Sequence, residues 1–138
     1  MMHDSVAYFE HDADMGIVGR GACVEEAFEH AAAAVFAMMA DPAQIMLRTR
    51  VTVEFDEPDI ELALVIWINI LLGQARSRGL VFGHFRLRRE GAYWRGTAGG
   101  EPWNESMERG VEVKGATLTS LSVTQRDGMW EARCVVDV

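Results

Sequence analysis

The sequence predicts an α+β fold, in which one mainly antiparallel sheet carries two helices packed on one face. The apolar pattern reads, in order, as two strands, a helix, a strand, a second helix and then several strands. The later strands are joined by short turns, which favour antiparallel pairing. The chain has 138 residues, of which 49% are hydrophobic and 25% charged, so we expect a single globular domain over residues 1–138.

The N-terminal segment is typical of two strands joined by an acidic corner. Residues 6–9 are apolar, and the cluster EHDAD follows them at residues 10–14. Aspartate is depleted from strands and favours turns, whereas Ile17 and Val18 are β-branched and favour a new strand that ends at Gly21. A corner of this kind leaves carboxylates free to bind a ligand.

The first helix is predicted to begin after Cys23 and to end at Asp41-Pro42. Glu26 lies three residues after Cys23, which is the spacing of a capping box with cysteine in place of serine or threonine. Its apolar residues recur at helical spacing and predict a buried stripe. We interpret His30, beside this stripe, as a histidine at the rim rather than a ligand.

Residues 48–55 alternate between apolar and polar and predict a half-buried strand. A second helix is expected from Asp59 to Arg78, with Gly79 as its C-terminal cap. This helix is apolar on almost every side, which indicates burial. Any face left uncovered would be a contact surface for a partner or a second copy.

The remainder of the chain predicts a run of strands. A strand over Leu80–Arg89 turns at Gly91 into a hairpin partner over Ala92–Thr97, and residues 98–110 are expected to form a loop. Within that loop Trp103 is either a lid over the core or an exposed anchor for a partner. A last hairpin turns at Asp127-Gly128, which is the preferred type I′ pair.

The overall charge argues against direct, high-affinity binding of nucleic acid. The net charge is −8, and only 13 residues are lysine or arginine. Three of the arginines, Arg86, Arg88 and Arg89, lie close together, and we interpret them as a solvated strand face.

We expect a cytoplasmic protein with no membrane partner. The N-terminus lacks the pattern of a signal peptide, and the apolar run from Leu62 to Leu72 is too short to cross a bilayer. The two cysteines, Cys23 and Cys134, form no metal-binding pattern.

The C-terminus supplies a counterpart to the acidic corner. The last strand ends at Asp137, and Val138 carries the terminal carboxylate. If this strand lies beside the corner, Asp14, Asp137 and Val138 together offer oxygen donors of the kind that hard cations such as Ca²⁺ and Mg²⁺ prefer. The alternative is an ordinary turn aspartate and a solvated chain end.

Five motifs in order resemble the archease family: HDADMG, EEAFEHAA, GEP, VKGAT and the C-terminal VVDV. The resemblance runs from about residue 8 to the end. It implies a small accessory protein for the RNA ligase that joins 2′,3′-cyclic-phosphate or 3′-phosphate ends to 5′-hydroxyl ends, as in tRNA splicing and RNA repair. Such a protein helps the ligase become guanylylated and turn over repeatedly. RNA would be reached indirectly, through the ligase.

The resemblance also implies a divalent metal bound by Asp14 and Asp137 beside Val138. Calcium is the first expectation, with magnesium or manganese as alternatives. Four further matching positions are expected to contact the partner or to take part in activation: His11, Asp12, Glu101 and Lys114.

The chain departs from the family pattern at three places. Leu118 stands where an aromatic residue is common, Asn104 replaces an aspartate after GEP, and the segment at residues 107–109 lacks a histidine. These changes put the contact with the ligase in question.

No catalytic residues are assigned, because the sequence contains no nucleophile elbow, P-loop or dinucleotide-binding motif. Together with these absences, the resemblance to the archease family implies a protein activator rather than an enzyme. Two alternatives stay open. One is a chaperone-like modulator of an RNA modification enzyme, and the weaker one is a small metal-dependent hydrolase.

Overall fold

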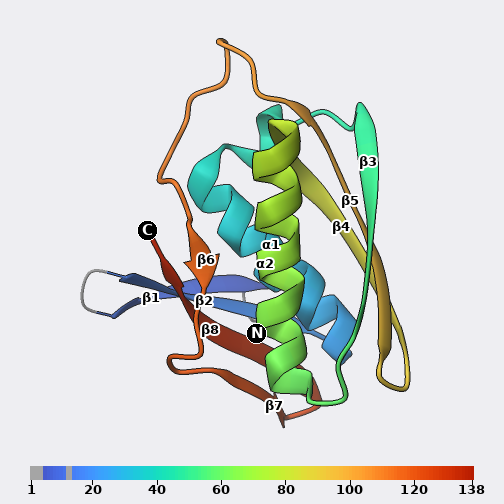
Figure 1. The fold of residues 1–138 in the computed structure, drawn as a ribbon. Coiled ribbons are helices and arrows are strands. Elements are labelled where there is room, and N and C mark those ends of the chain that lie inside the picture. Colours follow the sequence, from blue (N-terminus) through green and yellow to red (C-terminus); the bar gives the residue numbers. More distant parts are fainter. Residues whose placement is uncertain (1–4, 12–13) are drawn as a thin grey trace.

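The structure, a computed structural model, describes residues 5–11 and 14–138, with the backbone alone for His11. Two helices, α1 (Val24–Met39) and α2 (Ile60–Arg78), lie at the centre, and antiparallel strands surround them (Figure 1). A 3₁₀ turn, Pro42–Gln44, follows α1.

The described strands form two antiparallel sheets. The five-stranded sheet has the order β1-β2-β8-β6, with β7 also pairing with β8, and the three-stranded sheet has the order β3-β5-β4. The strand bounds are β1 Val6–His11, β2 Asp14–Gly21, β3 Thr49–Asp56, β4 Leu80–Glu90, β5 Tyr93–Pro102, β6 Gly115–Ala116, β7 Ser122–Arg126 and β8 Met129–Asp137.

The α+β class, the antiparallel pairing and the two helices are confirmed, with one correction: the strands divide between two sheets instead of forming one. Helix α1 packs against β2 of the five-stranded sheet and also against β4 of the three-stranded sheet. Apolar alternation identifies the buried face of a strand but not its partner, so the sequence could not separate the two sheets.

The predicted start of α1 is confirmed. The Sγ atom of Cys23 accepts the N–H of Glu26 at 3.4 Å, and Oε1 of Glu26 accepts the N–H of Ala22 at 3.1 Å. Strand β2 approaches α1 so closely at Gly19 that an added Cβ would lie 2.2 Å from the carbonyl oxygen of Ala27. Glycine at this position therefore lets the strand and the helix touch.

Helix α2 has the predicted caps. Oδ1 of Asp59 accepts the N–H groups of Glu61 and Leu62, and Gly79 ends the helix with φ of 65°. Judged by length and composition alone, α2 is the one helix within residues 5–11 and 14–138 that could cross a membrane. Its inner side is nevertheless packed in the core, as expected for a core helix, through Ala63, Leu64, Trp67, Ile68, Leu71, Leu72 and Ala75.

Strand β5 is longer than predicted, and this corrects the expected loop. It extends to Pro102, so the GEP motif lies inside the sheet. The irregular segment after it is tied to the end of α1, because the N–H groups of Gly110 and Val111 donate to the carbonyls of Met39 and Met38. The half-buried ring of Trp103 packs against the core, as the lid interpretation expects.

The last hairpin is confirmed. Asp127 and Gly128 adopt φ of 53° and 76°, which are the positive values of a type I′ turn. Strand β8 is central and buries Cys134, and this burial raises the pKa of the Cys134 thiol to about 12. The thiol is therefore protonated at neutral pH and serves as a small apolar core residue.

Candidate functional site

The pairing of β2 with β8 brings Asp14 beside Asp137. Strand β2 begins at Asp14, strand β8 ends at Asp137, and the neighbouring pair in the antiparallel ladder is Met15 with Val136. Residues directly opposite in such a ladder carry their side chains on the same face of the sheet. The C-terminus also lies on the side of the molecule where β1 ends and β2 begins (Figure 1). We call Asp14, Asp137 and the Val138 carboxylate the acidic end.

The other flank of the acidic end is held by α2. The N–H of Lys114 donates to the carbonyl of Asp137 at 2.8 Å. Oδ1 of Asn69 accepts the N–H of Ala116 at 2.8 Å, and the guanidinium of Arg76 donates to the carbonyl of Lys114 at 2.9 Å. These bonds fix the chain around β6 against the end of β8, and they place Lys114 next to Asp137.

An aromatic ring lies beneath the acidic end on the outer face of the sheet. Phe9 is opposite Gly16, and a Cβ added to Gly16 would lie 2.2 Å from the Phe9 ring. The guanidinium of Arg133 lies 4.7 Å from the centre of that ring. The residue next to Asp137 on this face, Val135, is 1% exposed. The sheet next to the acidic end is therefore covered on this face by an aromatic ring and contains a buried valine.

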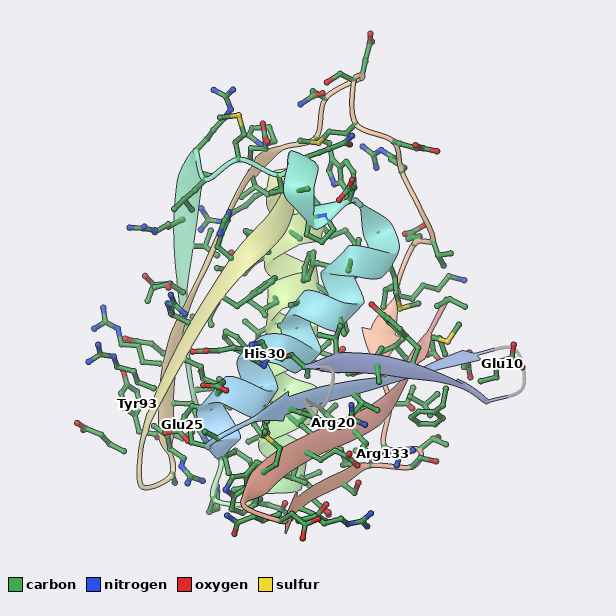
Figure 2. All side chains as sticks on the ribbon, turned by 180° about the vertical axis from the view of Figure 1, so that it is seen from behind. Glu10, Arg20, Glu25, His30, Tyr93 and Arg133 are labelled. Carbon is green, nitrogen blue, oxygen red and sulfur yellow. The ribbon has the colours of Figure 1, made fainter. Side chains whose placement is uncertain are left out.

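Two arginines of this face are engaged elsewhere. Arg20 and Arg133 both pair with Glu131, at 3.1 Å and 3.6 Å (Figure 2 labels the two arginines). Arg133 is four residues from Asp137 along β8, about 13 Å at the usual rise per residue. In the described part of the chain no basic group lies within 4.0 Å of Asp14 or Asp137.

The donor set fits a hard cation in its chemistry. Asp14 is half-buried, Asp137 is exposed, and Val138 is 38% exposed, so their oxygens are accessible. Oxygen ligands suit Ca²⁺ and Mg²⁺. Among residues 5–11 and 14–138 no group of three or more histidine, cysteine, aspartate or glutamate side chains that could hold a metal ion is gathered. The Val138 carboxylate is a further oxygen donor next to Asp137 in the sequence.

The remaining predicted site residues lie in different places. The backbone of His11 pairs with Asp14 at the same end of the sheet, whereas Asp12 lies outside the described residues. Glu101 lies on β5 in the three-stranded sheet. Its carboxylate is buried and accepts the N–H of Met46 at 2.7 Å and the Nε of Arg48 at 3.1 Å. The structure therefore gathers Asp14, Asp137, Val138, Lys114 and the His11 backbone, but not Glu101.

Two residues that support the site were not predicted. Asn69 and Arg76 of α2 bind the chain at residues 114–116 through their side chains. A signal for the first was present, since Asn69 is the polar interruption in the most apolar part of α2. Nothing in the sequence distinguishes Arg76 from a solvated arginine near a helix C-terminus.

Comparison with known proteins agrees with the sequence resemblance. The family model described as the Archease protein family (MTH1598/TM1083) matches residues 7–138. A protein archease from Sulfolobus acidocaldarius is 39% identical over 134 residues, which cover 95% of this chain and 96% of the relative. A protein archease from Pyrococcus furiosus is 35% identical over 137 residues, with 95% and 96% coverage.

Solved structures agree with the fold. The solution structure of Methanobacterium thermoautotrophicum protein 1598 matches with a TM-score of 0.83 and 28% identity, over 97% of this chain and 99% of that one. A crystal structure of an archease from Thermotoga maritima, described as a possible chaperone, matches with a TM-score of 0.68 and 22% identity over 100% and 98%. The match of the family model over nearly the whole chain, with close relatives of equal length, shows that the chain belongs to the archease protein family.

Proposed function

We propose that this chain is a cytoplasmic, non-enzymatic activator of the RNA ligase that joins 3′-phosphate to 5′-hydroxyl ends. It would promote guanylylation of the ligase and its repeated turnover. The observation that carries the proposal is the acidic end, where β2 and β8 bring Asp14 and Asp137 together beside the chain terminus. The family membership supplies the class of partner.

The acidic end is proposed to hold one divalent cation, calcium in the first place and magnesium or manganese as alternatives. Asp14, Asp137 and the Val138 carboxylate would supply the oxygen ligands. When bound, the cation would add a positive charge that attracts phosphate oxygens or carboxylates of the partner. Lys114, His11 and Asp12 are proposed to contact the ligase.

The charge of the chain suits such a partner. A ligase that binds RNA and a nucleotide needs a basic surface, and this chain carries a net charge of −8. Two arginines of the same sheet, Arg20 and Arg133, pair with Glu131 and not with the acidic end, so its carboxylates are available to a partner without the rupture of those ion pairs.

A multiple-turnover ligation assay with the cognate ligase tests the proposal. Wild-type protein should sustain turnover past the first round, and Asp14→Lys should abolish this effect because it reverses a charge in the acidic end. Asp56→Lys, at the exposed end of β3, makes the same charge change away from the site and should stimulate like wild type. Stimulation by Asp14→Lys, or none by wild type at any ratio, would overturn the proposal.

A chaperone-like role toward an RNA modification enzyme is the second candidate. The Thermotoga maritima archease is described as a possible chaperone. In this chain α2 keeps a partly exposed apolar strip around Leu62, which is 38% exposed. This role predicts a stable complex and suppressed aggregation of the enzyme, with no effect on ligase turnover.

A further inference from the structure

The outer face of the three-stranded sheet gathers basic side chains that the acidic end does not use. The register sets Arg50 of β3 and His84 of β4 on either side of Gly99, and it sets Arg86 opposite Thr97. Arg88 follows Arg86 on the same side of β4, because successive side chains alternate between faces. We call Arg50, His84, Arg86 and Arg88 the basic face, and all four are exposed.

A recess opens on this face where the sheet lacks a side chain. Gly99 lies between Arg50 and His84 and is covered by Leu47, whose Cδ1 would lie 2.2 Å from an added Cβ. The pairing of β4 also shifts at Gly83, at the edge beside α1. The resulting cavity has a volume of about 590 Å³, and its polar lining includes Arg50, His84, Arg86, Thr97, Glu29 and His30. Ligand pockets commonly have this size.

The arginines of the basic face form no ion pair with the residues at 5–11 and 14–138. Arg95, on the neighbouring strand, pairs with Glu54 at 3.4 Å, and the Glu29 carboxylate accepts the N–H of Leu87 at 2.8 Å. In the ranges that the structure describes, Arg50, Arg86 and Arg88 have no carboxylate within 4.0 Å. Glu54 and Glu90 share this face by register and strand alternation, but neither forms an ion pair with these three arginines. Like charges repel each other, so arginines gathered without a paired carboxylate favour the binding of an anion.

The spacing suits an extended polyanion. Arg86 and Arg88 are two residues apart on β4, so their Cα atoms lie about 7 Å apart along the strand. Arg50 lies on β3, two strands away, which is about 10 Å across the sheet. Guanidinium groups bind phosphate through paired N–H donors, and His84 and Thr97 in the recess can add hydrogen bonds. The acidic groups elsewhere on the chain are screened within a Debye length of about 8 Å, so the net charge of −8 does not cancel this local patch.

We propose that the basic face binds the phosphate backbone of an RNA strand, with Arg50 and Arg86 holding phosphates at the recess. The choice of RNA among polyanions rests on the proposed function. The acidic end lies on the five-stranded sheet and the basic face on the three-stranded sheet. The chain would therefore hold the RNA with one sheet while the other engages the ligase. This differs from the expectation that RNA is reached only through the ligase.

Fluorescence anisotropy with a short labelled RNA, in the absence of ligase, tests the proposal. Arg50→Gln/Arg86→Gln should weaken binding about tenfold or more at low salt. The slope of log affinity against log salt concentration should be shallower in this double variant by about 1.4, since each phosphate contact to a single strand contributes about 0.7. Arg78→Gln/Arg126→Gln removes the same charge from exposed positions off this face and should bind like wild type.

Three results would overturn the proposal: no binding of RNA by wild type at low salt, equal losses in the two double variants, or displacement of the RNA by polyglutamate at equal charge. The last result would assign the face to an acidic protein surface. A wild type that binds RNA but fails to stimulate ligation contradicts the proposed function alone, and one that stimulates without binding RNA contradicts this inference alone.

Discussion

Glu101 is the one charged side chain that is buried among the described residues, at 5% exposure. It connects β5 to the chain before β3, because its carboxylate accepts the Met46 N–H and the Arg48 guanidinium. Its neighbour Gly100 lies where an added Cβ would be 1.9 Å from the carbonyl oxygen of Val81. These contacts give the GEP motif a role in the fold, and a contact of Glu101 with the ligase stays a prediction.

Glu101→Ala should destabilise the protein by about 1–3 kcal/mol, since it leaves the partly buried Met46 N–H without its acceptor and removes the carboxylate that binds Arg48. Glu105→Ala, in the exposed loop after β5, should change the unfolding free energy by less than about 0.5 kcal/mol. Urea denaturation followed by circular dichroism measures both. Equal stability of the two variants would show that the buried carboxylate is not a structural anchor.

Helix α1 depends on the close approach of β2. At Gly19 an added Cβ would meet the Ala27 carbonyl oxygen at 2.2 Å and the Ala31 nitrogen at 2.3 Å, and both are backbone atoms that cannot move aside. Gly73 in α2 is the opposite case, because it is exposed and nothing lies within 4 Å of an added Cβ. The same substitution should therefore have opposite effects at the two positions.

Gly19→Ala should destabilise the protein by about 1–3 kcal/mol or more through overpacking of the helix–strand contact. Gly73→Ala should stabilise it by about 0.5–1 kcal/mol, because alanine has the higher helix propensity and loses less entropy on folding. Thermal unfolding of the two variants beside wild type measures the difference. Unchanged stability in Gly19→Ala would contradict the packing described for α1, and a loss of stability in Gly73→Ala would contradict the open surroundings described for that glycine.

Local signals predicted the elements well, and long-range contacts account for the misses. The caps at Cys23, Asp59 and Gly79 are readable because each acts within a few residues. The end of β5 was missed because Gly99, Gly100 and Pro102 are depleted from strands. In the fold these glycines allow neighbouring backbone to approach closely, as the nearness of Gly100 to the Val81 carbonyl oxygen shows.

At the scale of the whole molecule, pairing of distant strands decides the architecture and the site. The separation into two sheets depends on α1 packing against both β2 and β4, which alternation along single strands does not reveal. The meeting of Asp14 and Asp137 was predictable in part, from two carboxylate-bearing strand ends and the family resemblance. The support from Asn69 and Arg76 was not, since it depends on where β6 lies against α2.

Calorimetric titration of the protein with Ca²⁺ tests the acidic end most directly. Wild type should bind one cation per chain, and Asp14→Asn and Asp137→Asn should each weaken that binding about tenfold or more, because each removes one charged ligand without changing shape. Asp56→Asn, at the exposed end of β3, should bind like wild type. Equal affinity in all four proteins, or no binding by wild type, would contradict a cation site formed by Asp14 and Asp137.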